Sequence, residues 1–166
     1  MQNVVLIGMP ACGKSTLGVL LAKVLMMDFV DTDLLLQRKS GRPLQQMVDE
    51  LGSDGFSQVE EDFVASLSLE NTVIATGGSV ALEERAMAHL KENSVILFVK
   101  LSYESIEQRL KNISTRGIAM KKGQTLKDLY DLRQPFYHKW ADLIVEADGQ
   151  EIEQTVAQLV DTLKKR

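Results

Sequence analysis

The chain alternates short apolar runs with longer segments in which apolar residues recur at helical spacing. Apolar runs of about four to eight residues are typical of buried strands, whereas recurrence at every third and fourth position is typical of helices that cover a sheet. The pattern predicts strands at about 2–7, 29–31, 72–75, 95–101 and 143–145. Strands that alternate with helices indicate a parallel sheet, because each parallel pair needs a crossover connection.

The helical segments predict the outer layers of this sheet. The first helix begins near Lys14, and its inner face is expected to carry Leu17, Leu20, Leu21, Val24 and Leu25. Further helices are expected at 34–39, 81–91, 103–110, 125–138 and 151–164. Residues 42–69 are helical apart from a break at 52–55, where two glycines enclose a serine and an aspartate. We expect one α/β domain over 1–166, a three-layer sandwich with a helical excursion at about 32–69.

Composition and charge exclude several classes of protein. The 166 residues carry 19 Lys and Arg against 23 Asp and Glu, so the net charge is −4, which argues against a nucleic-acid platform. No apolar run approaches the roughly 20 residues that cross a bilayer, and the first strand leaves no room for a signal peptide. The single cysteine cannot form an internal disulfide. We therefore expect a cytoplasmic protein without nucleic-acid or membrane partners.

Residues 8–16 match the phosphate-binding pattern G-x-x-x-x-G-K-[ST] between a predicted strand and a predicted helix. Backbone N–H groups of such a loop can surround phosphate oxygens at the positive end of the helix. Lys14 can neutralise the outer phosphates, and the Ser15 hydroxyl can ligate Mg²⁺. The competing interpretation is a glycine-rich turn with an exposed lysine. The residues assigned to nucleotide binding here are Gly8, Ala11, Cys12, Gly13, Lys14, Ser15 and Thr16.

Other classes of P-loop protein lack support. A regulatory GTPase needs Asp-x-x-Gly after a strand and a guanine-reading Asn-Lys-x-Asp, but Asp49 and Gly52 match the first only inside a helical segment, and the second is missing. A mechanical ATPase needs an apolar strand that ends in Asp-Glu, and the strands at 73–76 and 97–100 end otherwise. A kinase of small molecules remains.

Two carboxylates follow the second predicted strand at the edge that carries the phosphate loop. Asp31 and Asp33 could divide the tasks of binding a metal and accepting a proton from a hydroxyl. Taken alone, Asp33 is typical of a helix N-cap, but its place beside a P-loop favours the chemical interpretation.

Glycines and arginines further along the chain are candidate ligand contacts. Gly77 and Gly78, which follow Thr76 after the third predicted strand, could bring backbone N–H groups close to a ligand, unless they form a simple turn. Arg116, in a polar segment at about 111–124 that we interpret as a mobile lid, and Arg133 could reach an anion. An isolated arginine is more often a solvated surface residue.

The combination of these motifs resembles the shikimate kinases over nearly the whole chain. The resemblance implies a five-stranded parallel sheet of the nucleoside monophosphate kinase type, ATP and Mg²⁺ as cofactors, and phosphoryl transfer to the 3-hydroxyl of shikimate. Relatives of this size are expected to act as monomers. The matching elements are the N-terminal P-loop, Asp31-x-Asp33, Gly52 with Phe56-x-x-x-Glu60, Ala75-Thr76-Gly77-Gly78, a basic lid and Arg133-x-Pro135-Phe136-Tyr137.

The resemblance also implies a role for each matching residue. Lys14 would hold the phosphates, Ser15 and Asp31 the metal, and Asp33 the acceptor hydroxyl. Gly77, Gly78 and Arg133 would form the acceptor pocket, with Arg133 on the substrate carboxylate. Arg116 would close over the phosphates during catalysis, and Arg109 falls where the family stacks an arginine on adenine.

Three departures from the usual pattern of the family affect the half of the site that would bind the acceptor. The family usually has arginine where this chain has Ser57, a third glycine where it has Ser79, and Arg-Pro-Leu where its lid reads Arg-Gly-Ile at 116–118. A charged hydrogen bond contributes roughly 1.5–3 kcal/mol, so losing one clamp would weaken shikimate binding by about 10- to 150-fold. Alternatively, Ser57 and Ser79 would bind a different polyol or hydroxy acid, or the protein would bind nucleotide with little turnover.

Overall fold

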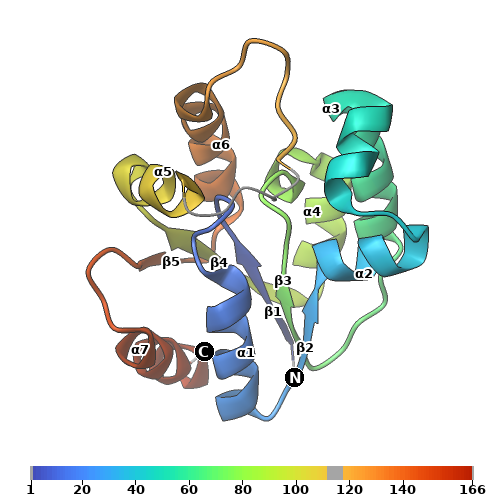
Figure 1. Cartoon of the computed structure of the whole chain (residues 1–166). Coiled ribbons are helices and arrows are strands. Elements are labelled where there is room, and N and C mark those ends of the chain that lie inside the picture. Colours follow the sequence, from blue (N-terminus) through green and yellow to red (C-terminus); the bar gives the residue numbers. More distant parts are fainter. Residues whose placement is uncertain (1, 112–117, 166) are drawn as a thin grey trace.

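Five parallel strands form the centre of the protein in the order β2-β3-β1-β4-β5 (Figure 1). The structure is a computed structural model, and it describes residues 2–111 and 118–165. The predicted parallel sheet of five strands is therefore confirmed. Its strands are β1 Asn3–Ile7, β2 Asp28–Asp31, β3 Thr72–Ala75, β4 Ser94–Lys100 and β5 Leu143–Glu146.

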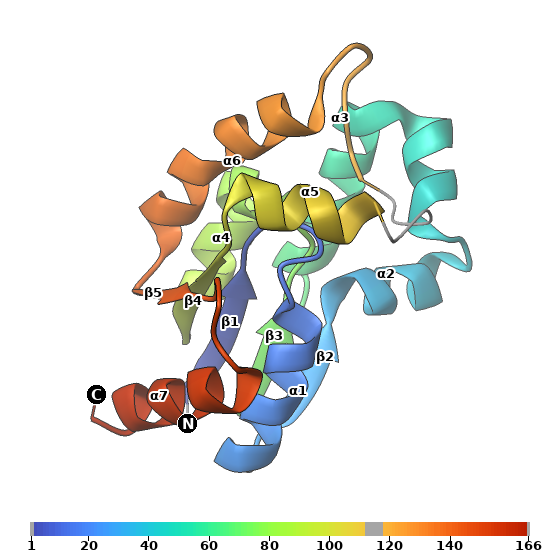
Figure 2. The same cartoon turned by 60° about the vertical axis from the view of Figure 1, so that its left-hand side comes forward.

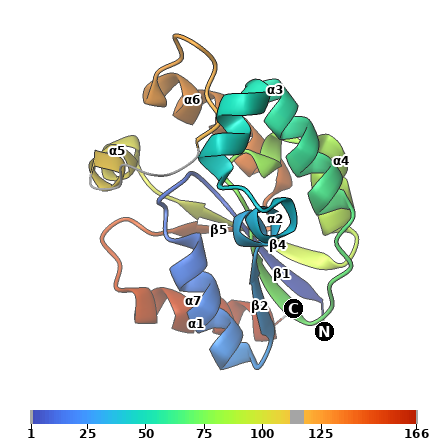
Figure 3. The ribbon, with the colours of Figure 1, turned by 45° about the vertical axis from the view of Figure 1, so that its right-hand side comes forward.

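Helices cover both faces of this sheet, which confirms the predicted three layers. Helices α1 and α7 lie on one face, whereas α4 lies on the other with α3 packed against it (Figure 3). No helix in the described ranges combines the length and apolar character that crossing a membrane requires. The helices are α1 Lys14–Leu25, α2 Thr32–Ser40, α3 Leu44–Ala65, α4 Glu84–Lys91, α5 Tyr103–Lys111, α6 Leu126–Trp140 and α7 Ile152–Lys164.

The helical excursion between β2 and β3 consists of α2 and α3. Helix α3 bends at Gly52, whose backbone is not helical (φ 72°, ψ 173°), so the predicted break is confirmed at its first residue. Figure 2 shows α2 and α3 on one side of the carboxyl ends of the strands and α5 and α6 on the other. The cavity at this end of the sheet, described next, is lined by residues of α2, α3 and α6.

The structure differs from the predicted elements at two places. The helix expected from residue 81 begins only at Glu84, because Val80–Leu82 form a single 3-10 turn (η1) and Glu83 is extended. On α1, Leu17 and Leu21 are buried as expected, but Val24 is 52% exposed and does not belong to the inner face. The first difference places the side chain of Glu83 beside the site described next.

Candidate active site

A cavity of about 460 Å³ lies where β1, β2 and β3 end. It brings together eleven of the residues that the sequence assigned to the site. Gly8, Cys12, Ser57 and Arg109 do not line it, and Arg116 lies outside the described residues. The predicted residues on its walls are Ala11, Gly13, Lys14, Ser15, Thr16, Asp31, Asp33, Gly77, Gly78, Ser79 and Arg133.

The phosphate loop joins β1 to α1, as its pattern predicts. Gly8 has a φ of 150°, and a Cβ there would lie 2.6 Å from the carbonyl oxygen of Val99, so no larger residue fits without a shift of the backbone. Lys14 is only 8% exposed, and its Nζ donates to the carbonyl oxygens of Gly8 and Met9, each at 2.8 Å. The interpretation of a merely exposed lysine is therefore wrong, since the ammonium lies inside the loop.

Cys12 is buried within the same loop rather than open to the cavity. Its Sγ lies 3.6 Å from Lys14 Nζ and would lie 3.0 Å from a Cβ at Gly8. The small thiol therefore contributes to packing behind the lysine.

Asp31 joins the phosphate loop to the start of α2. Its Oδ2 accepts a hydrogen bond from Ser15 Oγ at 2.7 Å, while its Oδ1 accepts from the backbone N–H groups of Asp33 and Leu34 at 2.9 and 3.1 Å. The N-cap of α2 is thus Asp31 and not Asp33. A hydroxyl and a single carboxylate oxygen in contact fit Mg²⁺, which takes few protein ligands and completes its shell with phosphate oxygens and water.

Asp33 and Glu60 flank Gly77 on the cavity wall. A Cβ on Gly77 would lie 2.6 Å from Asp33 Oδ1 and 2.7 Å from Glu60 Oε2, so the absent side chain makes room for both carboxyl groups. The N–H of Gly77 donates to Thr32 Oγ1 at 3.2 Å, which holds the turn against the start of α2. Asp33 therefore lies where it can meet a hydroxyl group next to bare backbone.

Arg133 supplies positive charge to the acceptor side of the cavity. Its side chain is 2% exposed on α6, its Nη2 donates to the carbonyl of Ala119 at 3.3 Å, and its buried Nε has no described partner. Tyr137, one turn later, donates its hydroxyl to the carbonyl of Gly78 at 2.6 Å, and burial raises its pKa, so it stays protonated. A buried guanidinium with its Nε donor left unpaired suits an anionic group of a ligand.

A chain of polar side chains lies behind the glycine turn. Ser57 Oγ donates to Glu83 Oε1 at 3.0 Å, the carboxyl groups of Glu83 and Glu60 lie next to each other, and Ser79 donates to Glu60. Burial raises the pKa of both carboxyls, that of Glu83 to about 10. Both serine hydroxyls that the sequence assigned to the acceptor are therefore donated to carboxyl groups of the protein.

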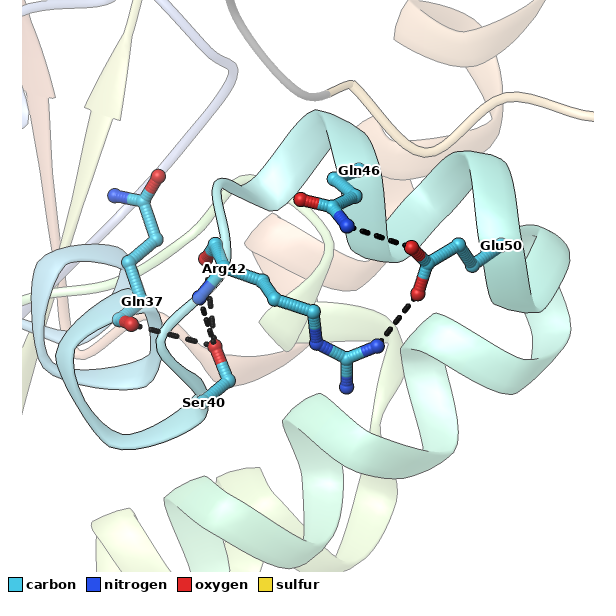
Figure 4. Close-up of polar contacts among 5 residues, drawn as sticks. All are labelled: Gln37, Ser40, Arg42, Gln46 and Glu50. Carbon is cyan, nitrogen blue, oxygen red and sulfur yellow. Dashed lines mark hydrogen bonds and ion pairs between the residues drawn. The ribbon is translucent and has the colours of Figure 1, made fainter.

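The rim of the cavity at the junction of α2 and α3 is fixed by side-chain contacts (Figure 4). Arg42 forms an ion pair with Glu50, which also accepts from Gln46 at 2.7 Å, and Ser40 bridges Gln37 and Arg42. The Gln37 side chain in turn accepts from the N–H of Leu44 at 3.1 Å. This network holds in place the rim residues Gln37, Pro43, Leu44 and Gln45, which the sequence did not point to.

Arg109 lies against the phosphate loop on the side of α5. Its Nη1 donates to the carbonyl of Ala11 at 3.1 Å and would lie 3.7 Å from a Cβ at Gly13. Of the segment we interpret as a lid, Ile118 and Ala119 line the cavity. The adenine contact of Arg109 and the phosphate contact of Arg116 stay predictions.

Comparisons with known proteins agree with this geometry. The family described as "Shikimate kinase" matches residues 10–164. Shikimate kinases of Hahella chejuensis and Thermodesulfovibrio yellowstonii are 35% and 32% identical over 98% and 96% of this chain, and over 86% and 94% of their own lengths. The structure of the Acinetobacter baumannii enzyme in complex with shikimate has a TM-score of 0.87 at 25% identity, covering 99% of this chain and 94% of that one. With its phosphate loop, acidic pair and buried arginine on one cavity, this chain belongs to the shikimate kinase family.

Proposed function

We propose that this protein transfers the γ-phosphoryl group of ATP to the 3-hydroxyl of shikimate. The observation that carries the proposal is the arrangement of the cavity, in which the phosphate loop, Asp33 and Arg133 line one space. A donor bound at the loop and an acceptor held by its carboxylate at Arg133 would meet beside Asp33. A small ring with one carboxylate and several hydroxyls matches the charge and the polar walls of this space.

Positioning and charge neutralisation carry the catalysis. Lys14 would leave the carbonyls of its own loop for the outer phosphates, whose oxygens would also meet the N–H groups at the start of α1. Asp33 would orient the acceptor hydroxyl and take its proton as the new P–O bond forms. Arg116 from the lid would add positive charge and help to exclude water.

Ser15 and Asp31, which are in contact beside the phosphate loop, would hold Mg²⁺. The ion supplies neutralisation of the charge that develops on the phosphate oxygens. Because the other oxygen of Asp31 caps α2, the metal site and Asp33 are held at a fixed spacing on one helical turn.

An ADP-release assay with shikimate and a panel of other hydroxy acids and neutral polyols tests this function. We expect turnover with shikimate and none with a neutral ring polyol, since Arg133 would be left without an anion. A higher kcat/KM with another compound of the panel would identify a different acceptor. Nucleotide binding without any accepted substrate would instead indicate a sensor.

Substituting Ser57→Arg tests whether the missing clamp limits acceptor binding. A guanidinium at this position adds a cation next to the carboxyl groups behind the glycine turn, and its side chain, longer than that of serine, could extend to an anionic acceptor. We expect the KM for shikimate to fall by about 10-fold or more, the effect of one charged hydrogen bond, with KM for ATP unchanged. Gln58→Arg, the adjacent and exposed position on α3, adds the same charge away from the cavity and should leave both values unchanged.

A further inference from the structure

The buried carboxyl groups of Glu60 and Glu83 form a pair that does not carry two negative charges. Glu83 is 4% exposed and extends from the short link between η1 and α4, while Glu60 lies on α3. Two ionised carboxylates in contact inside a protein repel one another, so one of them holds a proton.

The hydrogen bonds around the pair indicate which carboxyl holds that proton. Glu60 accepts from Ser79 and has the Arg133 guanidinium nearby, both of which favour its ionised form. Glu83 accepts only from Ser57 among the described donors, and its buried Oε2 meets none of them. An oxygen without a donor is the natural site of a shared proton, because the protonated carboxyl becomes the donor to Glu60.

The charged groups around Glu83 do not offer it a cation instead. Glu61 on α3 adds a further negative charge that opposes its ionisation. Arg85, two residues later on α4, is held at the surface by Asp62, and Arg133 on α6 acts on Glu60. Ser57 stands on the helix facing Glu83 and brings a hydroxyl rather than a charge.

We propose that Glu83 is a positioning residue that remains protonated, shares its proton with Glu60 and thereby leaves the Arg133 guanidinium for the anionic group of the acceptor. Without that proton, the Glu60 carboxylate would have the charge of Arg133 to compensate it and would draw the guanidinium away from the cavity. The proton thus takes the place of a positively charged side chain, which Ser57 does not supply. The acceptor part of this proposal rests on the proposed function, whereas the protonation state does not.

The protonation state is tested by the pH dependence of stability in the wild type and Glu83→Gln. In the unfolded chain Glu83 ionises near its ordinary pKa of 4.5, whereas in the folded protein its pKa is raised to about 10. Between these values folding takes up a proton, so the free energy of unfolding of the wild type falls as the pH rises. The variant needs no proton, and we expect its stability relative to the wild type to increase from about pH 6 to about pH 9 in urea unfolding. A constant difference over this range would overturn the shared proton, whatever the protein phosphorylates.

The positioning role is tested by comparing two variants of similar size. The amide of Glu83→Gln still donates to Glu60, so the KM for shikimate should stay within about threefold of the wild type, whereas Glu83→Leu removes the donor and should raise it about tenfold. The affinity for ATP should be unchanged in both, which also reports that each variant is folded. An equal rise in KM for the two variants, or no rise in either, would contradict the positioning role. If shikimate is not turned over at all, the proposed function fails, and the unfolding experiment still decides the protonation state.

Discussion

The variant Asp33→Asn is expected to retain nucleotide binding and to lose about 10²- to 10⁴-fold in kcat, the usual contribution of a general base. An amide of the same shape can still meet the acceptor hydroxyl but cannot accept its proton. The fold of the site should survive, because α2 is capped by Asp31 and not by Asp33. Steady-state kinetics with shikimate and a separate titration with ATP distinguish the two effects.

Asp28→Asn is the matched control for this experiment. Asp28 lies exposed at the opposite end of β2, so the same loss of one charge there should leave kcat unchanged. A kcat within about threefold of the wild type for Asp33→Asn would mean that Asp33 only orients the acceptor, since loss of a proton acceptor has a larger effect.

Substituting Arg133→Met is expected to raise the KM for shikimate by about 10²- to 10³-fold, because two charged hydrogen bonds of a guanidinium fork are lost together. Arg133 is the only cation among the described residues that lines the acceptor side of the cavity. The KM for ATP should change little, since no described hydrogen bond joins Arg133 to Lys14 or to the phosphate loop. The two KM values from one set of assays provide the measurement.

Arg133→Lys separates the charge of this residue from its shape. A lysine keeps the charge but not the planar fork, so we expect a KM between those of the wild type and Arg133→Met. Arg38→Met, on the exposed side of α2, serves as the control for losing an arginine. A parallel rise in the KM for ATP would indicate that the substitution disturbs the whole cavity and would contradict a specific clamp.

The fold could be predicted closely from the sequence because its signals are local. The strand Thr72–Ala75 is correct to the residue, and the bend of α3 occurs at a glycine that the pattern already marked. Val24 was misplaced because helical spacing alone does not tell how wide the buried stripe is. The delayed start of α4 reflects the 3-10 turn at Val80–Leu82, for which the apolar sequence there holds no signal.

Only part of the candidate site could be predicted from the sequence. Lys14 and Ser15 follow from a motif with fixed backbone geometry, and Asp31 follows from its place after the second predicted strand, so the structure brings the three together as expected. The part played by Ser57 could not be foreseen, since its partner Glu83 lies 26 residues away in the chain. In the sequence, Glu83 stands next to the exposed Glu84 and resembles a surface residue. Only the packing of α3 on α4 reveals that Glu83 is buried.

The two oxygens of Asp31 serve different parts of the protein, one meeting Ser15 and the other beginning α2. A substitution of Asp31 would disturb both the metal site and the helix that carries Asp33, so few other residues can be accepted at this position. No described hydrogen bond joins Asp31 to the layer formed by Ser57, Glu60, Glu83 and Arg133. Acceptor preference can therefore be redesigned in that layer by directed evolution while the phosphate donor half is held constant.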